Sequence, residues 1–273
     1  MLRRFCELKG THMPEPVILY SVTNGVATIT LNRPEVRNAF NDQMSDEMQA
    51  ALKSAERDAS VRCLVITGAG AGFCAGQDLA AVRERGAGVS FREHLLKTYN
   101  PIVAKLTSIE KPVIAAVNGA AAGAGWGIAL ACDLRVASEL AKFRLAFIGV
   151  GLAPDSGTSF FLPRYIGLGR ALELAYTNEV IDAQMALSLG LVNKVVPADQ
   201  LMPVTLELAL KLAQAPTKGL GLTKRAMIYA LTATVPEALD YEAHMQEVAG
   251  RSADHREGVN AFLEKRAPHF RGE

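Results

Sequence analysis

Two glycine-rich segments, each directly after a short apolar run, most constrain how this chain can fold. Residues 61–67 and 113–117 are short, largely apolar and rich in β-branched side chains, which predicts buried strands. Glycines crowd the segments that follow, residues 68–76 and 118–127. Glycine lets a backbone approach a ligand closely, and a loop that enters a helix leaves the first helical N–H groups unpaired. Two such junctions side by side would direct two N–H donors at one oxygen, which is the arrangement of an oxyanion hole.

The same glycines admit two other interpretations. They could serve only close packing in tight turns, or they could bind a nucleotide. Neither segment fits the dinucleotide-binding pattern GxGxxG, because Phe73 and Ile128 stand where the third glycine is required. Neither contains the phosphate-binding pattern GxxxxGK followed by Ser or Thr. A nucleotide site is therefore disfavoured, and the turn and oxyanion interpretations stay open on spacing alone.

The order of the predicted elements indicates an α/β fold. Strands are expected at 17–19 and 26–31, joined through the Asn-Gly turn signal at 23–25. A helix should begin at Asn41 or Asp42, and another is expected over 91–106. Strands and helices alternate in this way through roughly the first 190 residues, which predicts a sheet covered by helices.

The last third of the chain has a helical pattern from Pro197 onward. We expect breaks in it at Pro203, Pro216 and Pro236. The sequence predicts three parts. In chain order they are a disordered or non-native extension over 1–13, an α/β core over 14–195, and a C-terminal helical oligomerisation module over 196–273.

Composition excludes several classes of protein. Apolar residues make up 49% and charged residues 21%, so a packed core is expected. The net charge is +1, which offers no field for a nucleic acid backbone. The four cysteines and five histidines lack the spacing of a metal site. No apolar run is long enough to cross a bilayer. We therefore expect a cytoplasmic protein with reduced thiols and without a metal, nucleic acid or membrane partner.

Several motifs carry a resemblance to a known family. In chain order they are Leu31-Asn32-Arg33-Pro34 with Asn38-Ala39, Phe73-Cys74-Ala75-Gly76 with Asp78-Leu79, residues 111–119, Cys132-Asp133, and residues 264–268. Together they resemble the enoyl-CoA hydratase/isomerase, or crotonase, family from about residue 16 to the end. The resemblance implies the ClpP/crotonase-like α/β fold of repeated ββα units with a C-terminal helical trimerisation module. It also implies an acyl-CoA thioester substrate, no cofactor beyond the coenzyme A of that substrate, and a homotrimer or a dimer of trimers.

In the family that this chain resembles, two backbone N–H groups hold the thioester oxygen. Their positions correspond to Gln77 in the first loop and Ala124 in the second. A glycine usually stands at the second position, so the extra methyl of Ala124 must fit. The resemblance also implies substrate-binding residues, which are Arg37, Ala39, Cys74, Ala75, Gly76, Asp78, Leu79, Gly123, Trp126, Phe147 and Lys265.

Three of these residues have a plain alternative. Arg37 could reach a phosphate of coenzyme A, and Lys265 could serve the coenzyme A of a neighbouring subunit, but either could be a solvated surface charge. Trp126 could line the acyl pocket or simply pack in the core. His94 is expected to be a surface residue of a helix.

The fold leaves the reaction open, because the family includes hydratases, isomerases, dehalogenases and hydrolases. Family hydratases hold water between two glutamates, and the corresponding positions here are Gly127 and Phe147. Neither side chain can move a proton. Asp155 is the carboxylate that remains in this stretch. It could be the N-cap of the helix expected to begin near Thr158, or it could be an acid/base catalyst.

The resemblance favours catalysis by Asp155. Family Δ3,Δ2-enoyl-CoA isomerases of the peroxisomal type and phenylacetate-pathway ring-epoxide isomerases carry an acid after proline at this position. The ring-epoxide isomerases also resemble this chain at 99–101, 121–125 and 250–259. The implied mechanism has Asp155 move a proton from C2 to C4 of a 3-enoyl-CoA, or assist the rearrangement of a ring epoxide. An apolar surround should raise the pKa of this carboxyl.

Three alternatives remain open. The chain could be a hydratase, converting a 2-enoyl-CoA and water to a 3-hydroxyacyl-CoA. It could be a non-catalytic acyl-CoA-binding relative, because both hydratase acids are lost. It could also use Asp155 as a nucleophile, as 4-chlorobenzoyl-CoA dehalogenases do. The tryptophan and histidine partners of those dehalogenases fall on Phe147 and Asn100, which disfavours that reaction.

Overall fold

A computed structural model describes residues 15–84 and 90–273. Short strands form two sheets in this part of the chain. The larger sheet has the spatial order β1 (Ile18–Thr23), β2 (Val26–Leu31), β3 (Cys63–Gly68), β5 (Val113–Val117), β7 (Leu134–Ser138) and β10 (Lys194–Val196). The smaller sheet has the order β4 (Gly72–Cys74), β6 (Ala120–Ala122), β8 (Lys142–Arg144) and β9 (Ile181–Asp182).

Helices cover both sheets and extend beyond them. They are α1 (Asp42–Arg57), α2 (Leu79–Glu84), α3 (Phe91–Lys97), α4 (Tyr99–Ser108), α5 (Ala124–Ala131), α6 (Thr158–Ile166), α7 (Leu168–Thr177), α8 (Ala183–Ser188), α9 (Leu201–Ala213), α10 (Thr217–Ala230), α11 (Val235–Gly250) and α12 (Ala253–Leu263). Three short 3-10 turns are η1 (Pro34–Val36), η2 (Ile148–Val150) and η3 (Ala198–Gln200).

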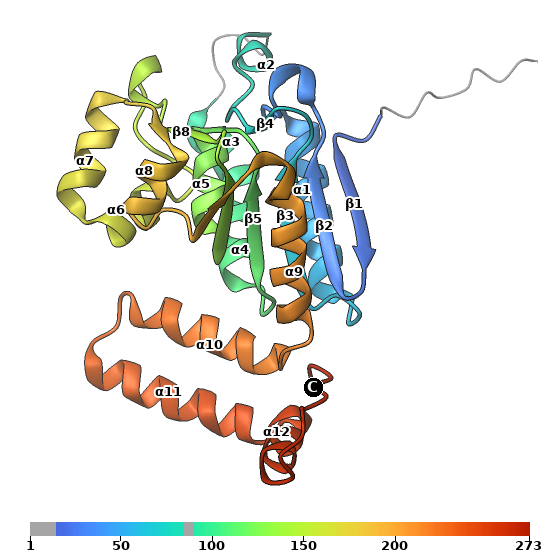
Figure 1. Cartoon of the computed structure of the whole chain (residues 1–273). Coiled ribbons are helices and arrows are strands. Elements are labelled where there is room, and N and C mark those ends of the chain that lie inside the picture. Colours follow the sequence, from blue (N-terminus) through green and yellow to red (C-terminus); the bar gives the residue numbers. More distant parts are fainter. Residues whose placement is uncertain (1–14, 85–89) are drawn as a thin grey trace, which may run out of the picture.

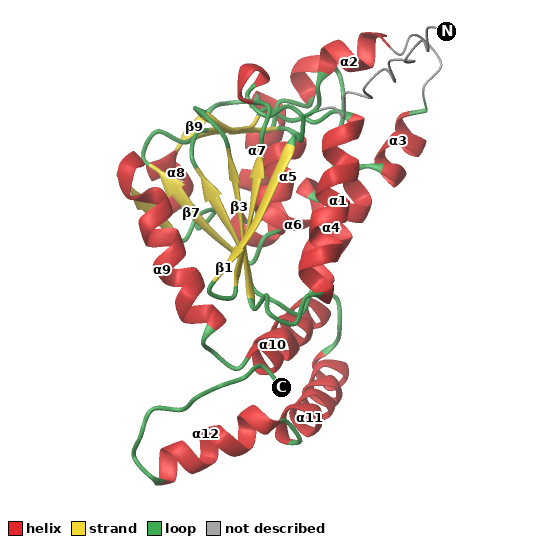
Figure 2. Cartoon of the chain, turned by 90° about the vertical axis from the view of Figure 1, so that its right-hand side faces the viewer, coloured by secondary structure: helices red, strands yellow, loops and turns green. Residues whose placement is uncertain are grey.

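The larger sheet is the centre of the α/β core. Strands β1 and β2 form the predicted antiparallel hairpin, and Asn24 and Gly25 adopt the positive φ angles (51° and 79°) of its tight turn. The remaining strands pair in parallel. Helix α9 lies on one side of the sheet and α1 and α4 lie on the other (Figure 2). Strands covered on both faces are buried along nearly their whole length, as β3 and β5 are, which explains the short apolar runs in the sequence.

The helix predicted over 91–106 is divided into α3 and α4. The break is at Thr98, where φ is −108° and ψ is −81°. Its physical cause is Pro101, which has no N–H to donate to the carbonyl of Lys97 and whose ring would collide with that carbonyl. The break matters because it gives α3 and α4 separate directions beside the first glycine loop.

The C-terminal region also differs from the prediction. Pro203 does not break the helical pattern, because it lies in the first turn of α9, where no N–H donor is needed. Helix α9 packs its apolar side chains against the larger sheet, with Ala209 and Ala213 in the same buried cluster as Val26 and Cys63. The helices that stand apart from the sheet are therefore α10, α11 and α12, which lie at the opposite end of the molecule from α2 and α3 (Figure 1).

Asn38 ties the N-terminal loop to the first glycine loop. It is fully buried and has a left-handed φ of 58°. Its Oδ1 accepts a hydrogen bond from the N–H of Arg33 at 2.8 Å. Its Nδ2 donates to the carbonyls of Ala69 and Gly72, at 2.9 and 2.8 Å. The Asn38 side chain therefore joins the loop at Arg33 to the first glycine loop at Ala69 and Gly72.

We predict that Asn38→Ala lowers the free energy of unfolding by about 2–4 kcal/mol, because buried polar groups lose their partners and alanine disfavours a positive φ. Urea unfolding measures this change. Asn32→Ala is the matched control, since the side-chain amide of Asn32 donates to the Pro16 carbonyl at 3.1 Å in an exposed position. Equal effects of the two substitutions would contradict the assigned role.

Candidate active site

A cavity of about 430 Å³ lies between the two glycine loops and helices α3 and α4. Its wall is largely apolar, with polar side chains from Gln77, His94, Tyr99 and Asp155. The lining residues are Ala75, Gly76, Gln77, Leu79, Val82, Phe91, His94, Leu95, Tyr99, Gly123, Ala124, Ala146, Phe147, Val150, Leu152 and Asp155. An apolar cavity with a few convergent polar groups is typical of a small-molecule site.

The first glycine loop leaves one backbone donor available at the cavity. The N–H groups of Ala75, Gly76 and Asp78 donate within the chain, over 2.9, 3.4 and 2.9 Å. None of the hydrogen bonds found among the described residues uses the N–H of Gln77. The carbonyl of Gly76, in the same peptide unit, accepts from the N–H of Phe40 at 2.7 Å. Because C=O and N–H point in opposite directions in a trans peptide, the Gln77 N–H points away from Phe40.

The second glycine loop brings the start of a helix to the same wall. Ala124 is the first residue of α5, so its N–H belongs to the turn that has no intrahelical acceptor. A Cβ placed on Gly76 would lie 3.4 Å from the Ala124 nitrogen and 2.8 Å from the Ala122 carbonyl. The two loops therefore touch through their backbones, and Gly76, at φ +90°, leaves room for that contact.

The helix α5 packs directly on the first loop. A Cβ on Gly125 would lie 2.4 Å from the Cys74 carbonyl, so no larger residue fits there without a shift. Cys74 is fully buried, and this burial raises the pKa of its thiol to about 12. Its Sγ accepts from the N–H of Gly76 at 3.4 Å and packs against Gly125, and it does not line the cavity, which gives it a packing role. Ala124 is nearly buried and lines the cavity, so the fold accommodates its methyl at this wall.

Asp155 enters the cavity from the loop between η2 and α6. Burial raises the pKa of its carboxyl, and a hydrogen bond donated by the Ser156 hydroxyl at 2.8 Å opposes part of that rise. Its side chain does not cap α6, whose N-cap residue is Gly157. The backbone carbonyl of Asp155 accepts instead from the N–H of Thr158, at 2.9 Å. The carboxylate is therefore not engaged as a helix cap.

Gly127 and Phe147 stand at the two positions that correspond to the glutamates of family hydratases, and neighbouring groups pack closely around both. A Cβ on Gly127 would lie 2.6 Å from the Ser156 carbonyl and 3.0 Å from the Thr158 hydroxyl oxygen. The loop that carries Asp155 thus occupies the space in which a Gly127 side chain would begin. Phe147 is nearly buried and lines the cavity as an apolar wall.

The other predicted binding residues divide into two groups. Ala75, Gly76, Gly123, Phe147 and Leu79 line the cavity. The rest do not: these are Arg37, Ala39, Cys74, Asp78, Trp126 and Lys265.

Asp78 is a structural anchor of the first loop. Its carboxylate forms an ion pair with Arg33 at 2.9 Å and accepts from the N–H groups of Ala80 and Ala81 at the start of α2. Arg33 also donates to the Ala39 carbonyl at 2.6 Å. The sequence pattern assigns no role to Arg33 beyond its place in the motif at 31–34, and the structure shows that it anchors this loop.

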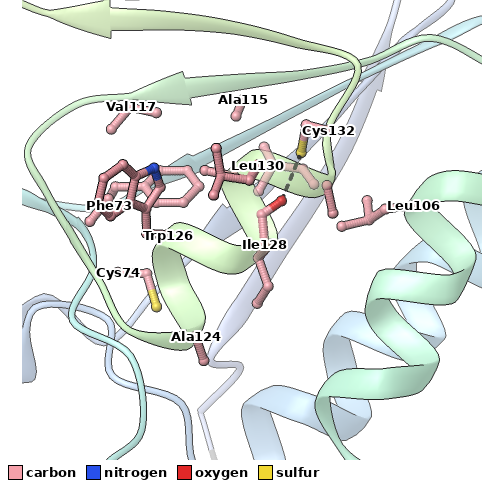
Figure 3. Close-up of a cluster of buried hydrophobic side chains, with 14 of the residues drawn as sticks. Phe73, Cys74, Leu106, Ala115, Val117, Ala124, Trp126, Ile128, Leu130 and Cys132 are labelled. Carbon is pink, nitrogen blue, oxygen red and sulfur yellow. Dashed lines mark hydrogen bonds between the residues drawn. The ribbon is translucent and has the colours of Figure 1, made fainter. Parts of the chain in front are cut away.

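Trp126, Arg37 and Lys265 lie away from the cavity wall. Trp126 is 1% exposed and packs against Phe143, with ring centroids 5.4 Å apart. Figure 3 shows Trp126 and Phe73 together in the buried cluster, which agrees with the packing interpretation. Arg37 and Lys265 are both exposed. Lys265 follows α12, the helix that lies at the other end of the molecule from α2 and α3 (Figure 1).

The expectation for His94 was wrong. It is half-buried and lines the cavity, with its Nε2 2.7 Å from the Gln77 Oε1. Tyr99, 2% exposed, donates its hydroxyl to the same oxygen at 2.7 Å. The sequence offered a signal only for Tyr99, through the motif at 99–101. His94 stands in a segment whose direction depends on the break at Thr98, so spacing could not reveal it.

Comparison with known proteins identifies the class. The sequence model described as Enoyl-CoA hydratase/isomerase matches residues 21–273. The 1,2-epoxyphenylacetyl-CoA isomerase of Escherichia coli (strain K12) is 48% identical over 257 residues, covering 93% of this chain and 98% of that protein. The trans-2-decenoyl-(acyl-carrier-protein) isomerase of Streptococcus mutans is 38% identical, with 93% and 98% covered. A crystal structure of an enoyl-CoA hydratase from Bacillus anthracis matches with a TM-score of 0.87 and 35% identity, covering 94% of this chain and 100% of that one.

Fold and cavity thus define a crotonase-fold enzyme. The chain belongs to the enoyl-CoA hydratase/isomerase family, and acyl-CoA thioesters are the substrates consistent with that family. Among the helices of residues 15–84 and 90–273, none is both long and apolar enough to cross a membrane.

We predict that Asp155→Asn stabilises the fold at neutral pH. The folded pKa of Asp155 is raised, so its protonated form favours folding, and stability falls as pH rises from the ordinary carboxyl range through the raised pKa. The neutral amide avoids that loss. The melting temperature of the variant should therefore exceed that of the wild type at pH 7.5, and the difference should shrink toward pH 4.

Asp182→Asn is the control, because asparagine caps α8 as well as aspartate does. A melting-temperature difference for Asp155→Asn that does not change with pH would contradict the assigned effect of burial.

Proposed function

We propose that this chain is an acyl-CoA isomerase that moves the double bond of a 3-enoyl-CoA to position 2, or rearranges a ring epoxide of phenylacetyl-CoA, through an enolate. The observation that carries the proposal is which carboxyl groups line the cavity. Asp155 lines the cavity with a raised pKa, while the two hydratase glutamate positions are Gly127 and Phe147.

The first step is polarisation of the thioester. In the proposal, the N–H groups of Gln77 and Ala124 donate to the thioester oxygen. The negative charge that develops on that oxygen is met by two fixed dipoles and by the positive end of α5. A donor of this kind contributes about 3 kcal/mol to the transition state. The protons at C2 become more acidic as a result, so a carboxylate can remove one.

The second step is a proton transfer by one group. Asp155 takes the proton from C2 of a 3-enoyl-CoA, the charge spreads over a dienolate, and the same carboxyl returns the proton at C4. Burial raises the pKa of Asp155, which makes its carboxylate a stronger base. The apolar side chains of Phe147 and Leu152 line the same cavity. The chemistry uses only groups of this chain, and coenzyme A enters as part of the substrate.

The relatives give this proposal further support. Two proteins similar to this chain over almost their whole length, at 48% and 38% identity, carry isomerase names, one for an epoxide of phenylacetyl-CoA and one for a decenoyl thioester. Hydratases also occur among the similar proteins, at 43% identity for the probable enoyl-CoA hydratase of Rhodobacter capsulatus and 36% for the short-chain-enoyl-CoA hydratase of Clostridium acetobutylicum. The names therefore leave both reactions in view, and the residues of the cavity favour isomerisation.

We also propose that the chain forms a homotrimer or a dimer of trimers. The helices α10–α12 carry large apolar side chains that are 60–83% exposed in the single chain, and these are Met227, Val235, Leu239, Phe262 and Leu263. Side chains of this kind favour burial against another subunit.

We predict that Asp155→Asn lowers kcat for 3-hexenoyl-CoA by about 10³-fold, since the loss of an acid/base group costs about 10² to 10⁴. The rise in absorbance of the conjugated enoyl thioester measures the reaction. Binding of coenzyme A thioesters, measured by calorimetry, should persist. Asp182→Asn should keep the wild-type rate. An unchanged rate in Asp155→Asn would remove Asp155 from the mechanism, and binding without turnover of any acyl group by the wild type would indicate a non-catalytic relative.

We predict that the wild type does not hydrate crotonyl-CoA and that Gly127→Glu does not create this activity. The new side chain would meet the Ser156 carbonyl, so the melting temperature should fall by several degrees, about 2–4 °C for each kcal/mol lost. Gly169→Glu is the matched control, because nothing lies within 4 Å of a Cβ on this helical glycine. A stable Gly127→Glu variant that consumes crotonyl-CoA would overturn the steric argument.

A further inference from the structure

The side chain of Gln77 is held on three sides. Its Nε2 donates to the Phe40 carbonyl at 3.2 Å. Its Oε1 lies 2.7 Å from the Tyr99 hydroxyl and 2.7 Å from the His94 Nε2. The Phe40 carbonyl can only accept, which fixes the amide orientation and leaves Oε1 facing two donors. His94 therefore carries its hydrogen on Nε2 in this arrangement.

The partners of Gln77 come from rigid surroundings. Tyr99 is 2% exposed, and its ring packs edge-on against Phe40 with centroids 5.7 Å apart. Phe40 is 1% exposed. His94 meets the Tyr99 ring edge-on at 5.8 Å. The hydroxyl and the imidazole therefore present fixed donors from two helices to one acceptor.

The backbone beside Gln77 is held by a bridge to Phe40, while the neighbouring Gly76 adds little stiffness of its own. Gly76 has a φ of +90°, and glycine permits a wider range of peptide orientations than any other residue. The peptide between Gly76 and Gln77 is held at its carbonyl by the Phe40 N–H, at 2.7 Å. On the Gln77 side, the restraint comes from the side chain and from the Asp78 N–H bond to the Phe40 carbonyl at 2.9 Å.

We propose that Tyr99 and His94 are positioning residues that set the direction of the Gln77 N–H through the Gln77 side chain. The inference rests on the proposed oxyanion hole. Helices α3 and α4, which line one side of the cavity, thereby fix the direction of a backbone donor in the first glycine loop. A donor displaced by about 1 Å costs up to about a hundredfold in rate, so loss of the tether should lower kcat more than it changes KM.

The test uses Tyr99→Phe, Gln77→Met and the double variant in the full-length protein. Tyr99→Phe removes one oxygen, and Gln77→Met keeps the side-chain length without hydrogen bonds. Each should lower kcat for 3-hexenoyl-CoA about tenfold or more, with KM within about twofold. The double variant should be no slower than Gln77→Met, because the tyrosine acts through that glutamine. His94→Phe should behave as Tyr99→Phe does.

A spectroscopic readout separates positioning from folding. Cinnamoyl-CoA has no proton at C4 and cannot isomerise, and its absorption band should shift to the red on binding when donors polarise its carbonyl. Tyr99→Phe and Gln77→Met should each reduce that shift while the protein stays folded by circular dichroism. Tyr165→Phe is the matched control, because that hydroxyl bonds to the Leu130 carbonyl at 3.3 Å and Tyr165 does not line the cavity.

The possible results are distinct. A full red shift and unchanged kcat in Tyr99→Phe would overturn the positioning role while leaving the oxyanion hole intact. Independent, additive losses in the double variant would also overturn it. No red shift in the wild type would overturn the oxyanion hole and this inference together. Should Gln77→Met fail to fold, the comparison of Tyr99→Phe with Tyr165→Phe still decides the question.

Discussion

The contact between two backbones is the constraint on which the rest of this site depends. The first glycine loop and the start of α5 approach each other closely. A Cβ on Gly76 would lie 2.8 Å from the Ala122 carbonyl oxygen, and a Cβ on Gly125 would lie 2.4 Å from the Cys74 carbonyl oxygen. Only this approach brings the N–H groups of Gln77 and Ala124 to one wall of the cavity. The strands β3 and β5 fix the distance, because they are paired in parallel and both feed into these loops.

The same helix also decides what chemistry the cavity can support. Small residues along α5 let two loops pack against it, the first glycine loop at Gly125 and the Asp155 loop at Gly127. The second contact occupies the place of one hydratase glutamate. The loop that carries the proposed acid/base therefore occupies the space in which a glutamate side chain at position 127 would begin. Donors and acid are set by the packing of one short helix.

The polar network around Gln77 connects the two walls of the cavity. Its partners lie 17 and 22 residues further along the chain, in helices separated by the break at Thr98. The apolar pattern of residues 91–106 predicts one helix, and periodicity does not report the direction of a helix after a break, so it could not place His94 at the cavity. The ion pair of Asp78 with Arg33 likewise joins residues 45 apart in the chain, so local pattern could not reveal it.

The sequence by itself determined the α/β class, the family, the two loops and the candidate carboxylate Asp155, because these depend on local runs, turn signals and motifs that stay contiguous in the chain. Only the tertiary structure decided that Trp126 packs in the core, that α9 belongs to the sheet, and that His94 and Tyr99 meet Gln77. The physical reason is that burial and hydrogen-bond partners depend on which distant segments the fold brings into contact.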